Sequence, residues 1–135
     1  MDRSHPRPWI GRSALRLEGP AAVLDSVSSL AMRSALDGLA LRQRVTANNI
    51  ANVNTPGFHA QRVSFEDALA RSVSMGSGSV QATTDTSMEP TRLNGSNVNL
   101  DTETLSNIDT VLRFQFAARA VEGPFASIRT ALRTS

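Results

Sequence analysis

The chain has 135 residues, of which 40% are hydrophobic but only 4% aromatic, and a formal net charge of +2 at pH 7. This length limits it to one modest domain. Without cysteine it has no disulfide, no thiolate zinc site and no cysteine nucleophile. His5 and His59 have no second ligand at metal spacing, so no metal or cofactor is predicted. No apolar run reaches the ~20 residues of a membrane helix.

Local patterns divide the chain into four segments. Prolines and glycines among residues 1–22 predict a disordered N-terminal lead. Residues 23–53 are predicted to form one long axial helix, because proline is absent and Gly38 is the only glycine. Residues 54–97 form a turn, a short helix and a flexible middle, and residues 98–135 a second axial helix. We therefore expect a mainly α fold, with two long terminal helices packed antiparallel like a coiled coil around a short irregular or β middle.

The first long helix carries apolar and amide residues at steps of three and four, the spacing of a helix–helix seam. At ~1.5 Å per residue it is about 45 Å long, more than one small core can bury. We therefore predict that it contributes to an assembly interface. The predicted residues are Met32, Leu36, Leu39, Leu41, Val45, Asn48, Asn49, Ile50, Asn52 and Val53.

A strong stop signal follows this helix. Pro56 disfavours helix at Thr55, and Pro56-Gly57 fits the centre of a type II turn, where glycine supplies the positive φ. Residues 58–63 alternate as an extended segment. Ser64 is predicted to cap a short helix from Phe65 to about Ser72. Residues 73–97 are rich in small polar residues and predict a mobile segment or a small β-hairpin, with a strand near 80–84.

The second long helix is predicted to start near Asn99 or Asp101, with Asp101 and Glu103 facing the helix dipole. Pro124 interrupts the pattern, so a kink or a break is expected there. The predicted interface residues again recur at steps of three and four. They are Val111, Phe114, Ala118, Val121, Phe125, Ile128 and Leu132.

The end of the first helix and the turn after it carry a recognisable signature. The residues that carry it are Ala47, Asn49, Ile50, Ala51, Asn52, Thr55, Pro56, Gly57 and Phe58. This run closely resembles the N-terminal motif of flagellar rod, hook and filament-type axial proteins. Residues 94–103 and 112–115 resemble stretches of the proximal rod proteins of the flagella basal body rod protein family.

The resemblance implies a structural subunit of the bacterial flagellar basal-body rod, which assembles by helix packing and transmits torque through the periplasm. Implied partners are other copies of itself, neighbouring rod subunits, the rod–MS-ring adaptor, export-gate proteins and the type III export apparatus. The missing apolar stretch near the N-terminus predicts export without a cleaved signal peptide.

Three other functions compete with this one. Another axial protein of the same family is the nearest alternative. A nucleic-acid binder is suggested by 14 basic residues, but they are spread along the chain and balanced by 12 acidic ones. An enzyme requires a nucleophile with a base, a phosphate loop or a paired carboxylate site, and no such pattern occurs, so neither catalysis nor a small-molecule substrate is expected.

Overall fold

The computed structural model describes residues 19–133, and within that range the side chains of 20–25 and 124–129 are not described. Most of the predicted N-terminal lead, residues 1–18, therefore lies outside the described residues. The same holds for the side chains of Phe125 and Ile128, two of the predicted interface residues.

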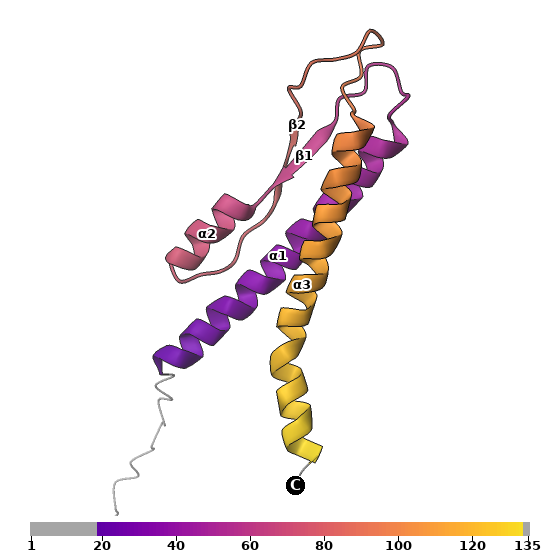
Figure 1. Cartoon of the computed structure of the whole chain (residues 1–135). Coiled ribbons are helices and arrows are strands. Elements are labelled where there is room, and N and C mark those ends of the chain that lie inside the picture. Colours follow the sequence, from indigo (N-terminus) through magenta and orange to yellow (C-terminus); the bar gives the residue numbers. More distant parts are fainter. Residues whose placement is uncertain (1–18, 134–135) are drawn as a thin grey trace, which may run out of the picture.

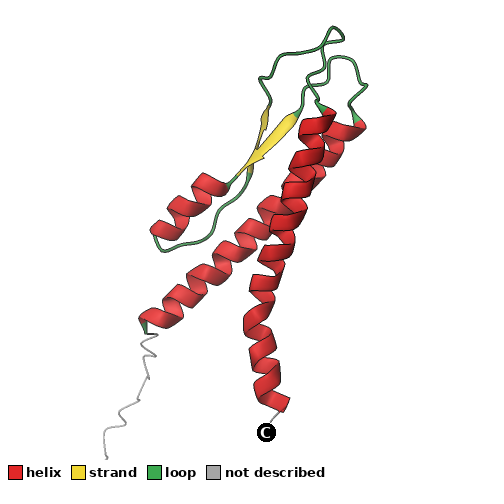
Figure 2. Cartoon of the chain, in the orientation of Figure 1, coloured by secondary structure: helices red, strands yellow, loops and turns green. Residues whose placement is uncertain are grey.

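The elements are α1 (Pro20–Ala51), β1 (Gln61–Ser64), α2 (Glu66–Ser74), β2 (Thr83–Thr86) and α3 (Leu100–Arg133). Helices α1 and α3 run antiparallel and pack together where α1 ends and α3 begins, then diverge toward their other ends (Figure 1). The strands and α2 pack on α1 as a smaller second layer (Figure 2). The predicted fold class, mainly α with two long helices and a small β middle, is confirmed.

Helix α1 has defined signals at both ends. Pro20 lies in its first turn, where the missing N–H costs nothing, and Gly19 is the N-cap. At the other end, the Asn52 N–H donates to Asn48 O and Asn49 O at 3.1 Å, and the chain then turns. Gly57 adopts a φ of 70°, and the Phe58 N–H donates to Thr55 O at 3.2 Å, which closes the four-residue turn.

The two strands form one antiparallel pair, in which Gln61 lies opposite Thr86 and Ser64 opposite Thr83. Strand β2 therefore pairs with β1, which lies before α2. The local hairpin considered within residues 73–97 does not form. Ser64 is not the cap of α2, contrary to expectation. The N-cap is Phe65, whose ring is only 4% exposed, and the Ser64 hydroxyl lies 3.3 Å from that of Thr83.

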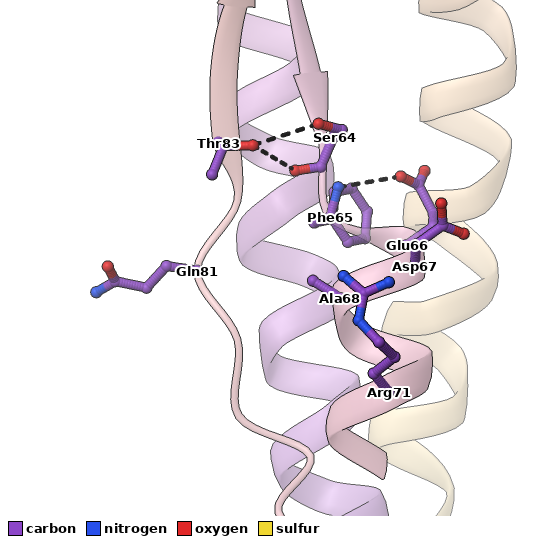
Figure 3. A pocket seen from close by; sticks show the side chains of 8 residues that line it. All are labelled: Ser64, Phe65, Glu66, Asp67, Ala68, Arg71, Gln81 and Thr83. Atoms are coloured by element: carbon purple, nitrogen blue, oxygen red, sulfur yellow. Dashed lines mark hydrogen bonds between the residues drawn. The ribbon is translucent and has the colours of Figure 1, made fainter. Parts of the chain in front are cut away.

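A shallow hollow lies where the strand pair meets the first turn of α2 (Figure 3). Its walls come from both strand segments and from one face of the helix, and the Gln81 side chain points away from it. The lining residues are Ser64, Phe65, Glu66, Asp67, Ala68, Arg71, Gln81 and Thr83.

The hydrophobic core is small and lies where α1, α3 and β1 meet. Its buried members are Leu39 of α1, Val63 of β1, Phe65 at the start of α2, and Ala117 of α3. Phe65 packs directly over Gly38, where an added Cβ would lie 2.6 Å from the ring. The only glycine in the interior of α1 thus leaves the space that the Phe65 ring occupies.

The segment after α2 is bonded to α1. The Ser34 hydroxyl donates to Gly78 O at 3.1 Å and accepts from the Val80 N–H at 3.1 Å. Gly78 has a φ of 74°, and a Cβ there would lie 2.4 Å from Val27 O. Both its backbone conformation and its closeness to α1 require glycine.

Helix α3 continues through Pro124 to Arg133 as one helix, so the break considered at this proline does not occur. Proline removes one backbone hydrogen bond there, and the bonds on either side maintain the helix.

The Gly38 contact predicts the effect of adding a single methyl group. We expect Gly38→Ala to destabilise the subunit by about 1–2 kcal/mol, because the overlap with Phe65 outweighs the gain of ~1 kcal/mol in helix propensity. Gly123→Ala is the matched control, since no atom outside its chain neighbours and the surrounding helix backbone lies within 4 Å of its added Cβ. Urea unfolding followed by circular dichroism measures both variants. A Gly38→Ala midpoint at or above that of the control would contradict this packing.

Candidate assembly interface

Asn49 lies at the packed end of α1 and is fully buried. Its side-chain amide pairs with the backbone of Gln61, donating to the carbonyl oxygen at 2.8 Å and accepting from the N–H at 2.9 Å. Nδ2 also donates to Glu103 Oε2 at 3.0 Å. One side chain of α1 thus fixes the position of β1 and contacts α3.

Glu103 brings a carboxylate into the interior, where its side chain is 0% exposed. Arg62 of β1 donates to Glu103 Oε1 and, at 2.9 Å, to Glu89 Oε2 of the loop after β2. Buried charge is tolerated only when it is paired and hydrogen-bonded, and here both conditions are met. Glu103 was expected only to face the helix dipole, so its structural role was missed.

Asn97 makes a similar set of bonds between separate segments. Its Oδ1 accepts from the Ala60 N–H at 2.7 Å, and its Nδ2 donates to Ser87 O and Glu89 O at 3.1 Å each. In the described part of the chain, no buried side-chain nitrogen or oxygen lacks a hydrogen-bond partner. We call the connected set the polar network; its members are Asn49, Gln61, Arg62, Glu89, Asn97 and Glu103.

Charge pairing shifts the pKa values of Arg62 and Glu66. Burial alone would lower the pKa of Arg62, but hydrogen bonds and attraction from Glu103 and Glu89 outweigh it and raise that pKa above its usual value. Burial alone would raise the pKa of Glu66, but hydrogen bonds from Arg42 and the backbone outweigh it and hold that pKa below its usual value. Arg42 also lies 5.0 Å from the centre of the Phe65 ring, so it joins α1 to α2.

The predicted residues of α1 are distributed around the helix. Leu39 and Asn49 are buried, whereas Asn48 is exposed. The remaining predicted positions are half-buried: Met32, Leu36, Leu41, Val45, Ile50, Asn52 and Val53. The turn residues Thr55, Pro56 and Gly57 are exposed at the tip where the two long helices meet.

On α3 the buried line differs from the predicted row by one residue. Its centre is Glu103, Thr110 and Ala117, at steps of seven. The predicted positions Val111, Ala118 and Val121 are half-buried, and Leu132 is 73% exposed. Phe114 is 37% exposed. The line was missed because two of its three members, Glu103 and Thr110, are polar.

The opposite face of α3 carries an apolar row that sequence analysis overlooked. Its members are separated from the buried line by about half a turn, given 3.6 residues per turn. We call it the outer row, and it consists of Leu105 (68% exposed), Ile108 (52%), Leu112 (61%) and Phe116 (76%). Large apolar side chains gathered on one exposed face mark an interaction surface.

The described residues contain no cluster of side chains suited to holding a metal ion. Across the same part of the chain, no helix combines the length and hydropathy needed to cross a bilayer.

Comparison with known proteins places this fold in a family. A sequence model described as "Flagella basal body rod protein" matches residues 30–59, which include the end of α1 and the turn. The chain is 30% identical over 124 residues to the flagellar basal body rod protein FlgB of Escherichia coli (strain K12), covering 76% of this chain and 90% of FlgB. It is 29% identical over 118 residues to FlgB of Bacillus subtilis (strain 168), covering 75% and 89%.

A third relative matches only in part. The flagellar basal-body rod protein FlgG of Caulobacter vibrioides is 42% identical over 64 residues, which cover 45% of this chain but 24% of FlgG. These matches, which include the end of α1 and the turn after it, define a structural protein of the axial type. The chain belongs to the flagella basal body rod protein family, and its similarity extends along nearly the whole length of FlgB. It is a structural subunit of the rod of the flagellar basal body, and the nucleic-acid alternative is not favoured.

The Asn49 contacts predict a large difference between neighbouring asparagines. We expect Asn49→Ala to destabilise the subunit by about 2–4 kcal/mol, because it leaves Glu103 and the Gln61 peptide short of partners in the interior. Asn48→Ala, at the exposed neighbouring position, is expected to cost less than ~0.5 kcal/mol. Urea unfolding of both variants measures the difference. Equal decreases in the free energy of unfolding would contradict a stabilising role for the buried Asn49 contacts.

The lowered pKa of Glu66 predicts a dependence on pH. A carboxyl whose pKa is lower in the folded state stabilises it above the usual value of 4.5, and this stabilisation disappears as pH falls through the folded pKa. We therefore expect the unfolding midpoint to fall less steeply below about pH 5 in Glu66→Gln than in the wild type. Arg42→Met should flatten the profile similarly, because it removes the partner. Profiles as steep as that of the wild type in both variants would refute the linkage.

Proposed function

We propose that this subunit is a proximal rod protein that assembles through its outer row and the diverging ends of its long helices. The observation that carries the proposal is the outer row of α3, whose four large apolar side chains are 52–76% exposed and lie about half a turn from the buried line. Four large apolar side chains on one helix face match the way helices pack between subunits.

The position along the rod is inferred from the similarity to FlgB, whose match covers most of both chains. The neighbours on this proposal are other copies of the chain, adjoining rod subunits, the rod–MS-ring adaptor and the export gate. The subunit would lie in the periplasm, reached through the flagellar type III apparatus without a cleaved signal.

A rod subunit on this proposal works mechanically. It transmits torque through repeated helix–helix contacts, whose buried area and hydrogen-bond register resist twisting. No residue is assigned a catalytic role, a cofactor or a substrate.

The proposal predicts that the outer row is needed for assembly but not for folding. We expect Leu112→Asp, expressed in a strain lacking its own copy of the gene, to abolish swimming and to leave no rods in isolated basal bodies, because a charge on the interface must be desolvated. The circular dichroism and urea midpoint of the purified variant should stay close to wild type. Ala70→Asp, which introduces the same charge at an exposed position of α2, is the control. Normal rods with Leu112→Asp would exclude the outer row as an interface.

A further inference from the structure

The polar network lies where α1, β1, α3 and the loop after β2 meet. Asn49 comes from α1, Arg62 from β1, Asn97 from the loop after β2, and Glu103 from α3. These residues are separated by 41 positions between Arg62 and Glu103 and by 54 between Asn49 and Glu103. A single connected set of hydrogen bonds therefore links segments that are distant in the sequence.

Stability alone is a weak explanation for such a set. A buried ion pair loses much of its Coulomb attraction to desolvation, and apolar residues of similar volume often replace one without loss of stability. Hydrogen bonds differ from apolar contacts in having direction. Arg62 donates to both Glu103 and Glu89, so it fixes α3 and the loop after β2 together.

Residues 87–97 of this loop are held tightly. The Ser87 N–H donates to Ala60 O at 2.7 Å, and Asn97 Nδ2 bonds both Ser87 O and Glu89 O. Yet the same loop exposes Met88 to 94% and Leu93 to 110%. The loop runs at the end of the molecule where α3 begins (Figure 1), so it presents two large apolar side chains to solvent there.

We infer that Asn49, Arg62 and Glu103 are positioning residues for rod assembly. Their directional bonds set how α3 crosses α1 and where the 87–97 loop stands, so that the outer row and Met88 with Leu93 meet neighbouring rod subunits in one geometry. The three act through the surfaces that they orient. This inference rests on the proposed assembly through the outer row.

The test separates position from stability. In the double variant Arg62→Met/Glu103→Met, apolar side chains replace the ion pair, and Asn49 keeps both of its bonds to the Gln61 backbone. The variant is therefore expected to fold, with a urea midpoint above that of Asn49→Ala. The chain has no cysteine, so spin labels can be placed at introduced Arg44→Cys with Ala120→Cys, and at Arg44→Cys with Thr91→Cys. Pulsed electron resonance should show both distance distributions shifted or broadened in the folded double variant, and the strain that carries it should lose swimming and rods.

A double variant that folds, keeps both distances and assembles rods would overturn the inference and leave the network a stabilising element only. Should that variant fail to fold, Arg62→Lys decides, since it keeps the charge but loses the forked geometry. We expect Arg62→Lys to fold with a shifted loop distance and to assemble fewer rods. Unchanged distances with normal swimming would overturn the inference. The distances are measured on the isolated subunit, so they stand apart from the Leu112→Asp result that tests the proposed function.

Discussion

The burial of one carboxylate constrains the arrangement of this subunit more than any other feature. Glu103 is completely removed from solvent at the start of α3, and an unpaired charge there would cost several kcal/mol. Arg62 and Asn49 supply the donors, so β1 and the last turns of α1 must both lie against α3. The turn at Pro56-Gly57 connects the end of α1 to β1 in this arrangement.

The interior built around this carboxylate is small and lies toward one end. Leu39, Val63, Phe65 and Ala117 form the apolar core, while the polar network occupies the end where the long helices meet. Beyond that region α1 and α3 separate (Figure 1). A chain of this size that uses long helices cannot bury all their faces by itself, because helices gain most of their stability from packing. This geometry suits a subunit of a larger assembly, in agreement with its family.

Two kinds of surface therefore have different physical roles. The seam between α1 and α3 holds two buried polar side chains, Asn49 and Glu103, which hydrogen-bond to each other across it. Such a pair favours a single register, because each group needs its own partner. The outer row is apolar and undirected, which suits contacts whose strength comes from area. In a structural rod protein, the first kind of surface would define the shape of each subunit and the second would join subunits together.

Local chemistry by itself determined the long helices, the turn with its positive φ at Gly57, and the family signature around Asn49 and Pro56, because helix propensity, proline and glycine act over a few residues. Tertiary structure decided the rest. Residues spaced by three and four positions can describe either of two adjacent rows on a helix. The sequence therefore predicted Val111 and Ala118 as interface residues, whereas Thr110 and Ala117 are the buried ones. Glu103 looked like a dipole partner because its real partners, Arg62 and Asn49, are 41 and 54 residues away in the sequence. Whether a polar side chain is buried depends on donors from distant segments, and only the folded chain brings those together.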